Sequence, residues 1–323
     1  MMDPLKVVVI DKPGASHLKA LDALPASIQV VVSNQAALLR ESVEDATIIV
    51  NGFPDGHLLR EIFLQATRLR WVHSLSDGVE KILFPELVAS PAVLTNARGV
   101  FKRSLAEFVI GAVLYFAKDF RRVVRSQQAA LWQPFEMEEA HGKVMGIVGY
   151  GETGRACAEK ARAFGMKILG LRRRPDLSKG DPLIEAVFGP NELHDLLAQS
   201  DYVVLAAPAT PLTRGLIGKA EFRVMKGSAV LINVGRGSSI DETAMIDALE
   251  QERIRGAALD VYETEPLPPV HPFYRMENVL LSPHCADHTP GFYELTMAFF
   301  IQNLQCFLKG EPLENVVDKQ AGY

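Results

Sequence analysis

The chain has 323 residues, 48% of them hydrophobic and 23% charged, which is long enough for two domains with separate cores. Its formal net charge of −5 gives no reason to expect a nucleic-acid or an anionic-membrane partner. No stretch approaches the ~20 apolar residues of a membrane span. Residues 1–10 lack a signal-peptide pattern, and the three cysteines are too dispersed for a disulfide framework. We therefore expect a cytoplasmic protein.

The first 95 residues alternate short β-branched runs with amphipathic segments. The predicted strands are 6–10, 28–32, 47–50, 69–73 and 92–95, and the predicted helices are 16–24, 36–42, 56–65 and 79–87. This alternation is typical of a parallel sheet that helices cover on both faces.

A long helix is predicted to lead out of this first region. Ser104-Leu105-Ala106-Glu107 fits a capping box ahead of the apolar run 108–120, which predicts a helix over 104–126. Its basic run, 121–125, is interpreted as a solvated helix face. Residues 127–143 have no clear periodicity, so we expect an ordered but irregular link.

A second alternating unit follows, from Val144 to about His284. Its predicted strands are 144–148, 167–171, 202–206, 229–232, 257–259 and 279–281. A last helical pattern, 291–308, lies beyond this unit and could pack on either domain.

A glycine motif at residues 149–154 predicts a dinucleotide site. Gly149, Gly151 and Gly154 follow a strand and open a predicted helix over 155–164, which is the context that the G-x-G-x-x-G pattern requires. The first glycine allows a tight turn, the second lets pyrophosphate approach the backbone, and the third lets helix and strand pack closely. Tyr150 and Thr153 belong to the same predicted site. The alternative is a tight turn that binds nothing.

The next strand ends in Arg172, Arg173 and Arg174 rather than in an acidic residue. An NAD site usually places Asp or Glu here, on the ribose hydroxyls. Guanidinium groups instead bind a 2′-phosphate, often with two hydrogen bonds. This predicts NADP(H) as the preferred cofactor with NAD(H) possible, the alternative being a solvated basic corner with relaxed cofactor choice.

Three strand-end loops carry the predicted catalytic residues: Arg236 within 233–237, Glu265 before a proline, and His284 after one. Each loop follows an apolar run, so the three should meet at one edge of a sheet. Arg236 can hold the carboxylate and carbonyl of a 2-keto acid. His284 can donate a proton, and a carboxylate beside it favours the imidazolium. If each residue is considered alone, Arg236 could instead be an ordinary interface arginine and His284 a core histidine.

A metal site is not predicted. His284 and His288 are four residues apart, a spacing that suits two ligands on a helix. Pro283 and Pro290 disfavour a helix there, and no third ligand is evident.

These motifs together resemble the D-isomer-specific 2-hydroxyacid dehydrogenase family over essentially the whole chain. The matching segments, in order, are 96–99, 106–107, 149–154, 233–237, 260–266 and 282–284. The resemblance implies an α/β protein of two Rossmann-like or flavodoxin-like domains, with doubly wound parallel sheets and a cleft between them. It implies a substrate domain from residues 1–100 plus 287–323 and a dinucleotide-binding domain from residues 101–286.

The resemblance also assigns roles to single residues. Arg236, Glu265 and His284 take the roles argued above, and Asp260 contacts the nicotinamide carboxamide. A loop with Ser76, Asp77 and Gly78 is implied to bind the substrate carboxylate through backbone N–H groups, although the charge of Asp77 departs from that purpose. The family also implies a homodimer, formed through the cofactor domain and the helix near 104–126.

Within the family, residues 130–134, the arginine-ended strand and the closing 317–323 look most like NADPH-dependent glyoxylate/hydroxypyruvate reductases. We therefore expect NADPH-dependent reduction of small 2-keto acids to D-2-hydroxy acids, with His284 as the proton donor. The alternatives are another acid, branched, aromatic or 3-phosphoglycerate, and a cofactor-sensing binding protein with the same fold.

Overall fold

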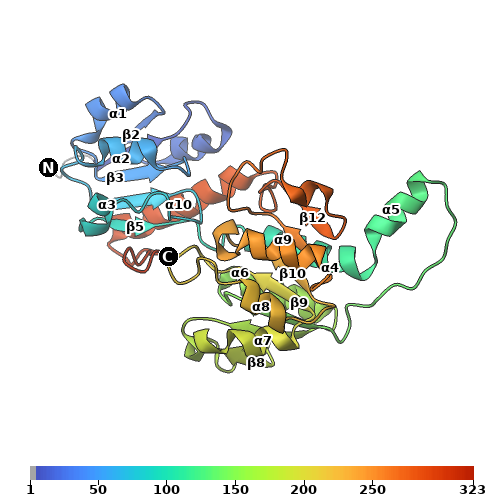
Figure 1. Cartoon of the computed structure of the whole chain (residues 1–323). Helices are drawn as coiled ribbons and strands as arrows, with labels where there is room; N and C mark the ends of the chain where they lie inside the picture. Colours follow the sequence, from blue (N-terminus) through green and yellow to red (C-terminus); the bar gives the residue numbers. More distant parts are fainter. Residues whose placement is uncertain (1–4) are drawn as a thin grey trace. The chain divides into compact units, whose positions relative to one another are not determined.

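The computed structural model describes residues 5–323 and forms two compact units (Figure 1). Unit 1 comprises Met1–Val100 and Thr289–Tyr323, and unit 2 comprises Phe101–His288. Residues 1–4, which begin the stretch tested for a signal peptide, lie outside the described residues. Among residues 5–323, no helix is both long and apolar enough to cross a bilayer.

Unit 1 is built on a five-stranded sheet in the order β2-β1-β3-β4-β5, all pairs parallel. Its strands are β1 (Leu5–Ile10), β2 (Ile28–Ser33), β3 (Ile48–Asn51), β4 (Trp71–Ser74) and β5 (Val93–Thr95). Its helices are the 3-10 helix η1 (Ser16–Ala23), α1 (Ala36–Val43), α2 (His57–Phe63), α3 (Pro85–Ala89) and α10 (Phe292–Lys309).

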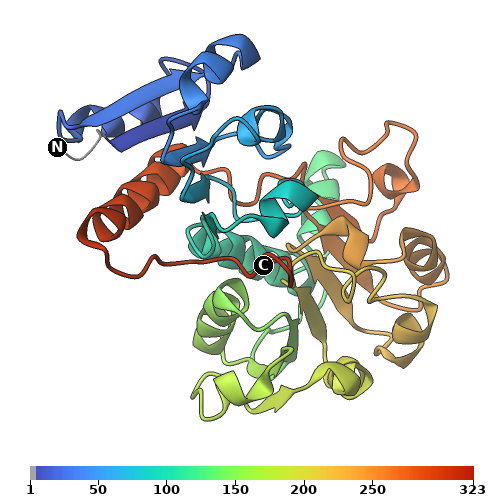
Figure 2. The same ribbon diagram turned by 90° about the vertical axis from the view of Figure 1, so that its left-hand side faces the viewer.

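Helices cover both faces of this sheet, as the alternating pattern predicted. Leu39 of α1 and Leu59 of α2 pack on one face. Leu18 of η1 and Phe300 of α10 pack on the other. Figure 2 shows α10 in red beside the blue strands of its own unit, although its sequence lies far from theirs.

Unit 2 contains a seven-stranded parallel sheet in the order β12-β11-β10-β9-β6-β7-β8. The strands are β6 (Val144–Val148), β7 (Lys167–Leu171), β8 (Ala186–Phe188), β9 (Tyr202–Leu205), β10 (Val230–Asn233), β11 (Gly256–Leu259) and β12 (Val279–Leu281). The helices are α4 (Lys102–Ala117), α5 (Phe120–Gln128), α6 (Glu152–Ala163), α7 (Leu193–Gln199), α8 (Lys219–Val224) and α9 (Glu242–Glu250). Short 3-10 helices are η2 (Pro175–Ser178), η3 (Pro190–Glu192), η4 (Gly237–Ser239) and η5 (Pro272–Arg275).

The order of these strands reverses at β6, which pairs with both β7 and β9. In open parallel sheets, ligands bind outside the carboxyl ends of the strands at such a reversal. The glycine motif follows β6 and therefore lies at this point. Two parallel-sheet α/β domains are thus present, and the predicted fold class is confirmed.

The predicted helix over 104–126 is wrong in detail, because the chain forms two helices there. The first begins at Lys102, so Ser104 is no cap; its hydroxyl donates to the carbonyl of Ala286 instead. The break comes at Asp119, whose φ is +46° and whose carboxylate accepts from the N–H of Arg122. A side chain that caps the second helix thus stabilises a left-handed residue between the two.

Two further elements differ from the prediction. The helix expected over 79–87 is confined to α3, because Pro85 occupies its first turn and the chain before it forms only a turn at residues 80–82. Strand β8 was not predicted; its three residues are only half-buried, too few for a periodic signal. The last helix belongs to unit 1.

Candidate active site

Arg236 lies in a tight loop after β10, and Asn233 holds that loop. The fully buried Asn233 amide donates from Nδ2 to the Arg236 carbonyl at 3.0 Å and accepts the Gly235 N–H at Oδ1 at 3.1 Å. Gly237 is required next, because a Cβ there would lie 1.9 Å from the Tyr262 carbonyl carbon. The Arg236 loop and the loop after β11 are therefore in direct backbone contact.

His284 and Glu265 form the pair that their spacing suggested. His284 Nδ1 lies 2.7 Å from Glu265 Oε2, and the other carboxylate oxygen accepts the Tyr262 N–H at 2.9 Å. A carboxylate can only accept, so Nδ1 carries the shared proton and Nε2 faces away from Glu265. The His284 side chain is 45% exposed, which leaves its ring accessible to a reactant.

The pKa of His284 is raised above its ordinary value, chiefly by the hydrogen bond to Glu265. Partial burial opposes this rise, the charge of Asp260 adds to it, and the charge of Arg236 reduces it. An acid and a cation thus share one electrostatic environment at the carboxyl edge of β10, β11 and β12. The arrangement can protonate an oxygen while binding an anion beside it.

Asp260 braces the loop that carries His284. Its Oδ1 accepts from Ser282 Oγ at 2.7 Å, from Cys285 N at 2.9 Å and from Ala286 N at 3.1 Å. Successive N–H groups that converge on one anion form a backbone nest. His284 has a φ of +51°, a costly conformation for a residue with a side chain, and these bonds to the next two amides stabilise it.

The glycine loop has the local geometry that a dinucleotide needs. A Cβ at Gly149 would lie 2.5 Å from Ala207 N, and one at Gly154 would lie 2.7 Å from the Gly149 carbonyl oxygen. Gly151, by contrast, has no other atom within 4 Å of that position, so a ligand can approach its backbone. The loop opens α6, whose first-turn N–H groups suit a pyrophosphate; half-exposed Thr153 lies in that turn. These residues fit the cofactor.

The arginine run lies beside this loop. The N–H groups of Gly149 and Tyr150 both donate to the Leu171 carbonyl at 2.9 Å, which brings the end of β7 against the loop. Arg172 is half-buried and donates from Nη1 to Ser178 Oγ at 2.6 Å, whereas Arg173 and Arg174 are exposed.

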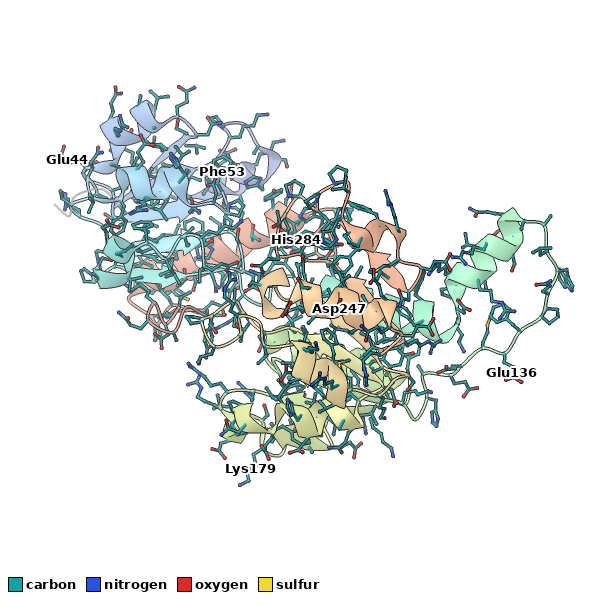
Figure 3. All side chains as sticks on the ribbon, viewed as in Figure 1. Glu44, Phe53, Glu136, Lys179, Asp247 and His284 are labelled. Carbon is teal, nitrogen blue, oxygen red and sulfur yellow. The ribbon has the colours of Figure 1, made fainter. Side chains whose placement is uncertain are left out.

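The cofactor and catalytic residues occupy different parts of the same sheet edge. The arginines follow β7, the glycine loop follows β6, and the catalytic loops follow β10, β11 and β12 on the other side of the reversal. Figure 3 shows Lys179, just beyond the arginine run, well away from His284. An extended molecule with a phosphate-rich middle matches this distribution.

The predicted carboxylate-binding loop belongs to unit 1, after β4. Its Ser76 N–H already donates to Ser74 Oγ at 3.2 Å, which competes with its predicted role. The Asp77 carbonyl accepts from Asn96 Nδ2 at 2.5 Å, and Ala97 N donates to the Ser76 carbonyl at 3.1 Å. These bonds fix the loop to the start of the segment after β5.

The bracing residues of the site were missed from the sequence. Asn233, Tyr262 and Ser282 each fix a loop that carries a predicted catalytic side chain. Only Asn233 had a usable signal, because an Asn two residues before a Gly at a strand end favours a side-chain-closed turn. The Tyr262 hydroxyl donates to the Ser282 carbonyl at 2.7 Å, and Ser282 Oγ donates to Asp260, so both act between loops that only the fold brings together.

Comparison with known proteins shows which family this site belongs to. Residues 110–286 match the model of the D-isomer specific 2-hydroxyacid dehydrogenase NAD-binding domain. A glyoxylate reductase of Korarchaeum cryptofilum is 33% identical over 93% of this chain and 88% of its own length. A D-3-phosphoglycerate dehydrogenase of Methanocaldococcus jannaschii is 28% identical over 97% of this chain, which spans 59% of that longer relative.

A solved structure supports the same family assignment. The NADPH-dependent glyoxylate/hydroxypyruvate reductase of Sinorhizobium meliloti, in complex with NADP and sulfate, superposes with a TM-score of 0.84. It is 27% identical, and the match covers 99% of this chain and all of that one. The predicted resemblance is confirmed: the chain belongs to the D-isomer specific 2-hydroxyacid dehydrogenases, a family of NAD(P)-dependent oxidoreductases.

Proposed function

We propose that this protein reduces small 2-keto acids, glyoxylate and hydroxypyruvate first, to D-2-hydroxy acids with NADPH. The observation that carries the proposal is the 2.7 Å pair of His284 and Glu265 in the electrostatic environment of Arg236. A proton donor beside an anion-binding cation is the equipment that a keto-acid reductase needs at its reacting centre.

Four residues of this chain have separate roles in the proposed reaction. Arg236 binds the substrate carboxylate and polarises the keto oxygen through its guanidinium N–H groups. His284 gives its Nε2 proton to that oxygen, while Glu265 keeps the ring protonated and oriented through Nδ1. The bound nicotinamide cofactor supplies the hydride. Asp260 keeps the His284 loop in place through its three hydrogen bonds and would hold the carboxamide of the bound nicotinamide.

The cofactor preference is assigned to the arginine run. Arg172, Arg173 and Arg174 replace the acidic residue that would repel a 2′-phosphate. The Sinorhizobium meliloti relative carries NADP, which supports the assignment.

Two further assignments rest mainly on the family. Unit 1 is proposed as the substrate domain, with Ser76, Asp77 and Gly78 binding the substrate carboxylate, and unit 2 as the dinucleotide-binding domain. The protein is also proposed to be a homodimer. Helix α5 has no buried residue, and Trp132 and Leu131 after it are 95% and 52% exposed, an apolar surface that suits a second copy.

The test is a turnover assay of the full protein with a panel of 2-keto acids and both cofactors. We expect glyoxylate and hydroxypyruvate to have the highest kcat/KM, and NADPH to exceed NADH. A preference for 3-phosphohydroxypyruvate would contradict the substrate assignment. Tight NADPH binding without turnover of any acid would favour a cofactor sensor.

The arginine assignment has its own variant. Replacing both Arg172 and Arg173 with Ala should raise the KM for NADPH by about 10²- to 10⁴-fold, since each charge-assisted phosphate contact contributes ~1.5–3 kcal/mol, or about 10- to 100-fold. The KM for NADH should change much less. Equal changes for the two cofactors would exclude contact with the 2′-phosphate.

A further inference from the structure

The segment after the arginine run folds back on the cofactor site through two of its own side chains. The first is Ser178, which is 5% exposed and accepts a hydrogen bond from Arg172 Nη1 at 2.6 Å. This bond fixes one edge of a guanidinium group that otherwise has several rotamers. The remaining N–H donors of Arg172 are left to bind a ligand.

The second side chain is Asp181, which joins three parts of the site. Its Oδ2 accepts from Tyr150 Oη at 3.1 Å and from Arg155 Nε at 3.0 Å, and its Oδ1 accepts the Leu183 N–H at 3.1 Å. Partial burial opposes ionisation, but the bonds from Leu183, Arg155 and Tyr150 outweigh it and lower the pKa of Asp181. A fixed carboxylate thus ties the glycine loop and the first turns of α6 to this segment.

Tyr150 shows why this connection reaches the glycine loop itself. The Tyr150 side chain is 2% exposed and lies against β7, where a Cβ at Gly170 would come within 2.9 Å of its ring. Its backbone N–H and that of Gly149 bond to the Leu171 carbonyl. Loop, strand end and following segment therefore form one hydrogen-bonded unit around the expected phosphates.

We propose that Ser178 and Asp181 are positioning residues of the cofactor site, with different effects. Ser178 holds Arg172 for the adenosine 2′-phosphate and so contributes to the choice of NADP(H). Asp181 holds Tyr150 and Arg155 and so shapes the part of the site that both cofactors share. The inference rests on the proposed cofactor preference.

The expected changes in cofactor Kd follow from the entropy cost of ordering side chains that the wild-type protein already holds in place. Immobilising a flexible side chain on binding costs ~0.5–1.5 kcal/mol, which corresponds to about 2- to 10-fold in Kd. Ser178→Ala should therefore raise the Kd for NADP⁺ about 2- to 10-fold and leave that for NAD⁺ unchanged. Asp181→Ala removes the hydrogen bonds from Tyr150 and Arg155, which shape the part of the site that both cofactors share. It should therefore raise both Kd values by about tenfold.

The control is Glu185→Ala. Glu185 lies in the same segment and carries the same charge as Asp181, but its carboxylate pairs with Arg162 at 2.8 Å on the exposed surface. Neither Kd should change. A change like that of Asp181→Ala would show that net charge, rather than positioning, causes the effect.

The measurement is isothermal titration of the full protein with NADP⁺, NAD⁺ and 2′,5′-ADP, which carries the 2′-phosphate without the nicotinamide. Ser178→Ala should weaken 2′,5′-ADP as it weakens NADP⁺, and should have no effect in an Arg172→Ala background. Suppose that the wild-type protein binds NADP⁺ more tightly than NAD⁺ and that Ser178→Ala leaves the ratio of the two Kd values unchanged. That result would overturn the role of Ser178 alone. A wild-type protein that binds both cofactors equally would overturn the preference and that role together, and an unchanged affinity in Asp181→Ala would overturn the role of Asp181.

Discussion

Two histidines, one in each unit, have opposite surroundings and opposite acid–base properties. His73 is in β4 of unit 1, is fully buried, and its Nδ1 lies 2.7 Å from the neutral hydroxyl of Thr95. His284 follows β12 of unit 2, is half-exposed, and shares a proton with Glu265. Burial lowers the pKa of His73 to about 3, whereas the carboxylate raises that of His284.

The difference shows what makes a histidine chemically useful here. Aromatic rings surround His73, including Phe299 and Phe300, and none of residues 5–323 supplies a charged partner that compensates for its lost hydration. The imidazole therefore stays neutral and serves as a core residue. His284 has a carboxylate partner and an accessible ring, so it can exist as the imidazolium near neutral pH and release a proton to a reactant.

The sharpest test of this contrast exchanges the predicted acid for a neutral amide. His284→Gln should lower kcat for keto-acid reduction by about 10²- to 10⁴-fold, the range of general acid catalysis, with little change in the free energy of unfolding. His73→Phe should instead lower the free energy of unfolding at pH 7, while kcat stays near the wild-type value. Steady-state kinetics and thermal melting of both variants measure this, and near-normal kcat in His284→Gln would exclude it as the proton donor.

A smaller effect is expected from the partner of His284. Because the Glu265 hydrogen bond raises the pKa of His284, the protonated form persists to higher pH and reduction should fall only above that raised pKa. Glu265→Gln should therefore move the alkaline limb of the kcat/KM profile to lower pH. Glu263→Gln is the matched control, since Glu263 pairs with Arg214 at 3.0 Å and should leave the limb in place. An unmoved limb in Glu265→Gln would contradict the assignment.

The smallest effect concerns stability in acid. The unfolded chain protonates His73 below pH ~6.5, whereas the native chain does not until about pH 3, so stability is lost as the pH falls between these values. At pH 5 the loss should be roughly 2 kcal/mol, from 1.36 kcal/mol per pH unit. Urea unfolding can be followed through Trp71 in a Trp132→Phe background, because these are the chain's two tryptophans. Equal acid sensitivity with and without His73→Phe would show that other groups cause the loss.

Much of the fold was predictable because local patterns agree with it. Strands β6, β7 and β12 have the predicted bounds, since each is an apolar run between turn residues or charges. The break at Asp119 was not predictable from periodicity, because it depends on a side chain that caps the following helix. Strand β8 is too short for any pattern.

The placement of the three candidate catalytic residues was predictable, but the residues that hold their loops were not. The spacing of Arg236, Glu265 and His284 after apolar runs indicated one sheet edge, because the carboxyl ends of parallel strands lie together. The three bonds to Asp260 Oδ1 come from residues up to 26 positions away. Ser178 and Asp181 likewise had no local signal, as their partners precede them by up to 31 positions.

By itself, the sequence determined the alternation of strands and helices, the family motifs and the chemical groups available for hydride transfer. Only the tertiary structure decided which of these groups are charged and how they are oriented. His73 and His284 have the same side chain, and their pKa values separate because burial and a carboxylate 19 residues away act on them through space. Such interactions depend on distance and solvent exposure, which the order of residues does not state.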